Sequence, residues 1–99
     1  MPNKIEIQDA IGAGTSRSSS IATGGAAQVL AAENPARVRL VGQNISGFDL
    51  WINELGGTAA ADTVDSFVVP PRATFRIDTT RAVSIVGAVT GQKFTALEF

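Results

Sequence analysis

The chain has 99 residues, enough for one domain with a single hydrophobic core. Its net charge is −1 and its basic residues are dispersed, so no field of one sign is available to attract nucleic acid. It contains no His, Cys or Tyr, which excludes disulfides, thiolate metal sites and the commonest general base, and only 17% of it is charged, which favours a surface partly covered by a partner.

The N-terminal segment, residues 1–16, is predicted to be an arm. Ile5 and Ile7 alternate with polar neighbours, as in a short strand, and residues 12–20 are rich in Gly and Ser, as linkers are. The segment is either a first strand of the same sheet or an arm that adds to the edge of a neighbour's sheet, and the linker favours the arm. No continuous apolar stretch is long enough for a secretory signal or a membrane span, so we expect no membrane contact.

Residues 17–99 are predicted to form short strands separated by turn residues. The strands are expected over 20–23, 26–32, 37–44, 48–54, 66–69, 74–78, 82–86 and 93–99. Alanine in 26–32 also favours a helix, but Gly24-Gly25 before it and Asn34-Pro35 after it leave little room for one. Frequent turn signals without a helical period predict an all-β fold, a small antiparallel β-sandwich of jelly-roll-like or Greek-key type.

The two strands over 37–44 and 48–54 are predicted to form a hairpin across the turn Asn44–Gly47. Alternation predicts that the inward-facing side chains are Val38, Leu40, Gly42, Phe48, Leu50 and Ile52. It places on the opposite faces Arg37, Arg39, Gln43, Asp49, Trp51 and Asn53.

Two aromatic residues are candidate interface anchors. Trp51 either binds a partner or lies in a second covered layer of the sandwich, and both interpretations stay open. Phe99, directly after a strand, poses the same choice, because an apolar side chain there is poorly placed unless it packs on something.

The sequence contains no convincing catalytic, cofactor or metal motif. Gly12-Ala13-Gly14 lacks the third glycine of a dinucleotide fingerprint. Asp62, Asp65 and Asp78 lack the spacing of a calcium loop. With Glu54 they could in principle form a carboxylate pair for glycoside hydrolysis, but Trp51 is the single aromatic platform available for a sugar. We therefore expect no enzyme, no cofactor and no metal.

The region from Asn34 to Phe99 carries a wider pattern. Its parts are Asn34-Pro35-Ala36-Arg37, Leu50-Trp51-Ile52-Asn53, the loop from Gly56 to Asp62, Phe67-Val68-Val69-Pro70-Pro71, Ala82-Val83-Ser84-Ile85 and Gly91-Gln92-Lys93-Phe94-Thr95-Ala96. In this pattern the chain resembles small structural proteins encoded in the virion gene clusters of tailed bacteriophages, of the head decoration or cement type.

The resemblance implies a non-enzymatic virion protein, made in the host cytoplasm, that binds the outside of an assembled capsid and stabilises it. Its partners would be the major capsid protein and further copies of itself, commonly as a trimer, with no nucleic acid or membrane involved. Contact with the shell is expected through the arm and one end of the sandwich, with the candidate contacts Ile5, Ile7, Trp51 and Phe99.

Two alternatives remain open. Similar domains occur at necks, tails and fibres, where the chain would be a receptor- or carbohydrate-binding module using Trp51 and Asn53. The other alternative is a small carboxylate enzyme, which the missing His, Cys and Tyr disfavour.

Overall fold

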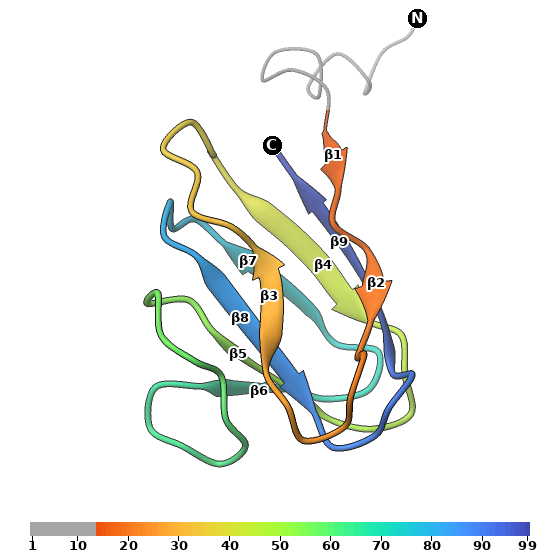
Figure 1. Ribbon diagram of the computed structural model, residues 1–99. Coiled ribbons are helices and arrows are strands. Elements are labelled where there is room, and N and C mark those ends of the chain that lie inside the picture. The colour runs from red at the N-terminus through yellow and green to blue at the C-terminus, as the bar shows by residue number, and fades with distance from the viewer. Residues whose placement is uncertain (1–13) are drawn as a thin grey trace, which may run out of the picture.

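The structure is a computed structural model that describes residues 14–99, and it consists of two antiparallel β-sheets (Figure 1). In the first sheet, β9 (Lys93–Glu98) pairs on one side with β1 (Thr15–Ser16) and β2 (Ser19–Ser20) and on the other with β4 (Leu40–Asn44), which then pairs with β7 (Thr74–Ile77). The second sheet has the order β3 (Gln28–Ala31), β8 (Val83–Gly87), β5 (Leu50–Asn53) and β6 (Phe67–Val69). The predicted all-β sandwich is confirmed, and the segment around Gln28 is a strand.

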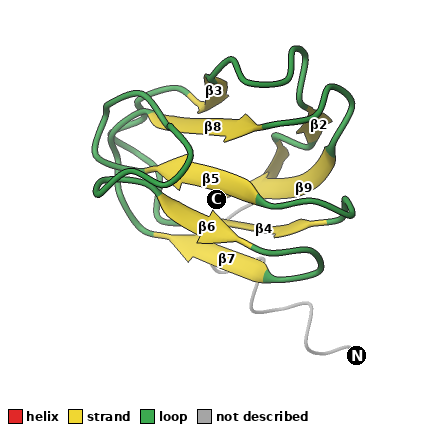
Figure 2. Cartoon of the chain, turned by 90° about the horizontal axis from the view of Figure 1, so that it is seen from below, coloured by secondary structure: helices red, strands yellow, loops and turns green. Residues whose placement is uncertain are grey.

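The chain passes repeatedly from one sheet to the other. Of the connections after β2, only that between β5 and β6 stays within one sheet, so the two sheet orders make a jelly roll, within the predicted class. Figure 2 shows the two sheets packed face to face. Four connections, 21–27, 45–49, 70–73 and 88–92, meet at one end of the sandwich, which we call the loop end (Figure 1, bottom).

The predicted hairpin between 37–44 and 48–54 is wrong. β4 pairs with β7 and β9, whereas β5 pairs with β6 and β8 in the other sheet. Alternation predicts only which side chains face the core. The same side chains face the core whether the chain returns to the same sheet as a hairpin or crosses to the other sheet. Asn44 stabilises the crossing, because its Nδ2 donates to the carbonyl oxygens of Phe48 and Val69, each at 2.8 Å.

The core lies between the sheets and is built by the alternating side chains of both. Its fully buried members include Ile21, Leu40, Leu50, Ile52, Ile77, Val83, Ile85 and Ala96. The predicted inward and outward directions are wrong just before β4 and just before β5. Arg37 is buried whereas Val38 is 52% exposed, and Phe48 is 58% exposed. All three residues lie outside β4 and β5, where the two-residue alternation of a strand no longer applies.

The connection between β5 and β6 covers part of the outer face of the second sheet. The backbone N–H of Ala59 donates to Ser84 Oγ at 2.9 Å, and Ala59 is buried. Asn53, predicted to face solvent, is consequently 5% exposed. Its Oδ1 accepts a hydrogen bond from the N–H of Leu55 at 2.8 Å.

Candidate interaction surfaces

A buried charged cluster joins the loops opposite the loop end. The side chain of Arg37 is fully buried, and it donates to the carbonyl oxygens of Ala32 at 3.0 Å, of Thr79 at 2.9 Å and of Arg81. It also donates to Glu98 Oε2 at 2.6 Å, while Arg17 Nη2 donates to Glu98 Oε1 at 2.7 Å. The cluster therefore ties the β3–β4 and β7–β8 connections to β9.

Glu98 stays ionised in this cluster. Burial raises the pKa of the Glu98 carboxyl, but the hydrogen bonds from Arg37 and Arg17 and the positive charge of Arg17 outweigh it, so the pKa lies below its ordinary value of 4.5. Because its charge is paired with two arginines, we interpret Glu98 as a structural residue rather than an acid–base catalyst.

At the loop end, a second buried network holds two turns together. Gln92 is 4% exposed, and its Nε2 donates to the carbonyl oxygen of Asp49 at 3.0 Å and of Phe48 at 3.3 Å. Its Oε1 accepts from the N–H of Val89 at 2.9 Å. Ser46 joins the network because its Oγ accepts from Gln92 Nε2 at 3.2 Å and donates to Asn44 Oδ1 at 2.7 Å. The polar groups are satisfied by one another, so the network fixes the turns and leaves little for a polar ligand to bind.

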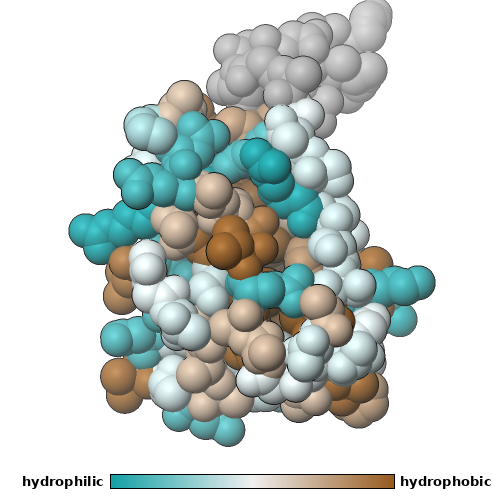
Figure 3. Space-filling view, in the orientation of Figure 1, coloured by the Kyte–Doolittle hydropathy of each residue, from teal (hydrophilic) through white to brown (hydrophobic). Residues whose placement is uncertain are grey.

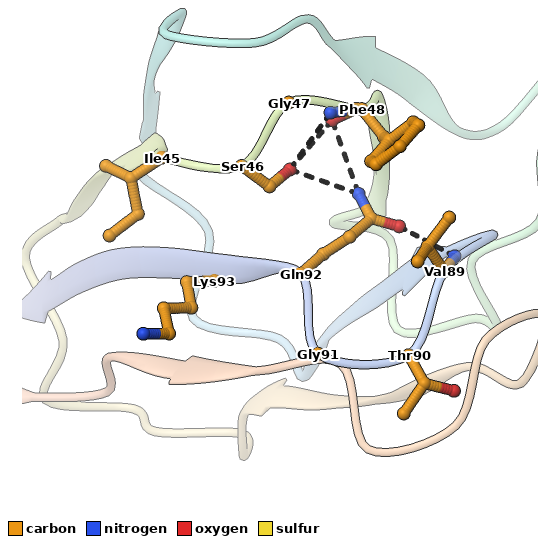
Figure 4. A pocket seen from close by; sticks show the side chains of 9 residues that line it. All are labelled: Ile45, Ser46, Gly47, Phe48, Val89, Thr90, Gly91, Gln92 and Lys93. Carbon is orange, nitrogen blue, oxygen red and sulfur yellow. Dashed lines mark hydrogen bonds between the residues drawn. The ribbon is translucent and has the colours of Figure 1, made fainter.

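Apolar side chains surround this network on the outside. A hollow of about 310 Å³ lies here, and its lining includes Ile45, Phe48 and Val89, whose side chains are drawn in Figure 4. These side chains are 37%, 58% and 40% exposed. The loop end therefore presents an apolar rim on turns that are already held in place, an arrangement suited to a protein partner.

The outer face of the first sheet forms another surface, which we call the basic face. Val41 and Leu97 are cross-strand neighbours at its centre, where a shallow hollow of about 470 Å³ lies. Alternation along β7 and β9 places the cationic side chains of Arg76 and Lys93 on this face. Arg39 joins them, because its backbone pairs with that of Phe99 and its guanidinium lies 5.0 Å from the centre of the Phe99 ring. One carboxylate, Asp78, lies beside them, 3.2 Å from Arg76.

Residues 54–68 form a surface on the second sheet that we call the acidic flank. Its exposed apolar side chains are Leu55 (56%), Val64 (101%) and Val68 (47%). Phe67 is also exposed, at the edge of the sheet, but its side chain lies on the opposite face of β6 because it pairs with the core residue Ile52. The same segment contains Glu54, Asp62 and Asp65. None of these carboxylates forms an ion pair with another described residue. Arg81 is the neighbouring cation, and its Nη1 donates to the carbonyl oxygen of Leu55 at 3.3 Å.

Trp51 is half-buried on the outer face of the second sheet. Its cross-strand neighbours are Val68 and Val86. Beside it, alanines of the β5–β6 connection line a hollow of about 170 Å³. The predicted second layer is thus partly present, because the connection covers part of this face, and the remaining surface of Trp51 borders the acidic flank.

The other candidate contacts are placed differently. Phe99 is half-buried, with the guanidinium of Arg39 lying 5.0 Å from its ring centre. Its ring also packs against Gly14, so the side chain already has partners within the chain. Ile5 and Ile7 lie outside the described residues. Thr15 and Ser16, placed in the arm from the sequence, pair with Glu98 and Leu97.

Sequence reasoning missed the apolar rim of the loop end. Phe48 was assigned to the core because it alternates with Leu50 and Ile52. The signal that could have placed it outside is the preceding turn, Asn44–Gly47, since a residue next to a crossing between sheets need not continue the alternation of the strand.

The carboxylates do not gather into a site. Within residues 14–99, no three of them come close enough to hold a metal ion. The face of the molecule seen in Figure 3 is mostly pale, with scattered hydrophilic side chains and a few hydrophobic ones. In the part of the chain that is described, no helix has the length and apolar character needed to cross a membrane.

Comparison of the chain with family models, with curated proteins and with solved structures finds no match.

Proposed function

We propose that this chain is a non-enzymatic virion structural protein that binds the outside of an assembled phage capsid and stabilises it. The proposal combines the resemblance of residues 34–99 to decoration proteins with one structural observation. That observation is the apolar rim of the loop end, where Ile45, Phe48 and Val89 are exposed together on fixed turns.

The rim is suited to a shell that is already assembled. The buried bonds of Gln92 and Asn44 hold the turns in one conformation, so little conformational entropy is lost on binding. Covering the exposed part of Phe48 would contribute roughly 1–2 kcal/mol. A ligand that binds the assembled shell and not its free subunits stabilises the assembly by mass action, and several copies bound together add avidity.

The carbohydrate-binding alternative has less support. It requires Trp51 and Asn53 to be accessible together, but Asn53 is 5% exposed and its Oδ1 accepts a backbone N–H. We therefore propose the capsid surface as the site of action, with the major capsid protein as partner.

The test is binding of the purified protein to empty expanded heads of the phage that encodes it, measured by co-sedimentation. Wild-type protein should bind saturably to expanded heads and not to free capsid subunits. Phe48→Ser should weaken binding about 30-fold, the loss typical of one interface hot spot. Val38→Ser, a matched change at a residue that is 52% exposed near the opposite end, should bind like wild type. Absence of wild-type binding, or equal binding by the Phe48 and Val38 variants, would overturn the proposal.

A further inference from the structure

Two surfaces of the molecule carry exposed charges of opposite sign, while Glu33, Asp49 and Arg72 are exposed elsewhere. The basic face carries the cations Arg39, Arg76 and Lys93 and the carboxylate Asp78. The acidic flank carries three carboxylates in residues 54–65, with Arg81 as the nearby cation. The formal net charge of the chain is only −1, yet no Lys or Arg occurs between Arg39 and Arg72, which leaves the acidic flank without a cation of its own.

Both surfaces also have exposed apolar side chains among their charges. On the basic face Leu97 is 37% exposed and lies beside Val41 at the edge of a hollow of about 470 Å³. On the acidic flank Val68 is 47% exposed beside Trp51, its cross-strand neighbour. An apolar centre with charged residues around it is the usual composition of a specific protein interface.

From these two observations we infer that copies of this chain associate head to tail, with the basic face of one copy against the acidic flank of the next. Each surface offers the charge that the other lacks, whereas two basic faces or two acidic flanks placed together would bring like charges into contact. The pairing is therefore heterologous, because the two contact surfaces are different.

The positions of the two surfaces allow one copy to use both at once. β6 belongs to the second sheet, while β4, β7 and β9 belong to the first, and the two sheets pack face to face (Figure 2). Repetition of a heterologous contact yields a closed ring when the rotation closes and a longer chain when it does not. The inference deepens the proposed function, of which a homo-oligomer is one part, but its test needs no capsid, so the two can fail separately.

The test uses one blocking variant on each surface of the full chain. Leu97→Glu adds a carboxylate to the basic face, and Val68→Lys adds a cation to the acidic flank, so each repels its partner surface. Light scattering should give an oligomer for wild-type protein and monomers of 10.2 kDa for each variant, with self-association weakened at least about 30-fold. Val29→Lys, at a valine that is 67% exposed on β3 at the far edge of the second sheet, is the matched control and should remain oligomeric.

Mixing the two blocked variants gives the decisive result. Each retains one intact surface, and the intact surfaces are the complementary ones. An equimolar mixture should therefore associate again, through a dimer of one copy each. The carboxylate added at position 97 and the cation added at position 68 also attract each other, so larger assemblies agree with the pairing as well. Thermal unfolding of each variant, followed by circular dichroism, shows that it is folded before the mixture is made. A mixture that stays monomeric, a Val68→Lys variant that keeps the wild-type mass, or a wild-type protein that is monomeric at all concentrations would overturn the inference.

Discussion

Substituting Glu98→Gln removes the negative charge that Arg17 and Arg37 share while keeping the length of the side chain. An amide has one accepting oxygen, so its NH₂ group must face one of the two guanidinium groups. The side chain of Arg37 is fully buried and would lose its charged partner at 2.6 Å. Breaking a buried pair on one side costs about 3–5 kcal/mol, a large part of the roughly 5–15 kcal/mol expected for the whole domain.

Urea denaturation of wild type and Glu98→Gln measures this cost. The midpoint should fall while the slope of free energy against urea stays the same, because the surface exposed on unfolding does not change. The control is Asp78→Asn, whose partner Arg76 is 63% exposed at the side chain, and which should cost less than about 1 kcal/mol. A Glu98→Gln loss no larger than that of the control would refute the assignment of Glu98 as the centre of a structural clamp.

The same residue predicts a pH dependence. The pKa of Glu98 is lower in the folded protein than its ordinary value of 4.5, so the stability that it supplies is fully present above that value. This stability is lost as the pH falls through the folded pKa. The difference in unfolding free energy between wild type and Glu98→Gln should be constant from about pH 6 to 8 and shrink below about pH 4.5. A difference that grows on acidification would contradict the sign of the shift.

Three further substitutions test the packing. Gly42→Ala sets a methyl group against a backbone carbonyl of β9 and should cost about 3 kcal/mol in urea denaturation, whereas Gly47→Ala, with open space around it, should stay within about 1 kcal/mol. Asn44→Ala removes two donated and two accepted hydrogen bonds and should lower the unfolding free energy by about 3 kcal/mol, and a loss below about 1 kcal/mol would contradict its role between the sheets. Ser84→Ala removes the acceptor of a backbone N–H in the β5–β6 connection, so limited proteolysis should cut there faster, and an unchanged rate would speak against the anchoring.

Much of the fold could be predicted, because the alternation of apolar and polar residues along a strand indicates which side chains are buried. Phe75 and Ile77 of β7, and Val83 and Ile85 of β8, face the core as predicted. Strand pairing could not be predicted, since it depends on which sheet each connection enters. The crossing after β4 depends on Asn44, which looks in sequence like an ordinary turn residue.

The buried charge could not be predicted either. Alternation places Arg37 on the face opposite to Val38 and Leu40, and a charged side chain rarely lies in a core unless it is paired. Its partner, Glu98, lies 61 residues away in sequence. No local pattern links the two, and only the jelly-roll arrangement brings β9 next to the β3–β4 connection.

The interaction surfaces were predicted only in part. Trp51 borders one of them, whereas Phe99 packs against Arg39 and Gly14. Composition indicated that the surface would carry few charges. The acidic flank follows from one segment of the sequence without Lys or Arg, whereas the basic face depends on the fold, because it combines Arg76 and Lys93 from two strands that are not neighbours in sequence. The place of Ile5 and Ile7 in the arm stays a prediction.

The most direct measurement of the central proposal is a cryo-electron microscopy map of expanded empty heads incubated with the purified protein. The account predicts additional density on the outer surface, repeated at equivalent positions of the shell lattice, with the Ile45, Phe48 and Val89 end toward the shell. Bare shells at saturating protein concentration, or density with the loop end pointing into solvent, would contradict it.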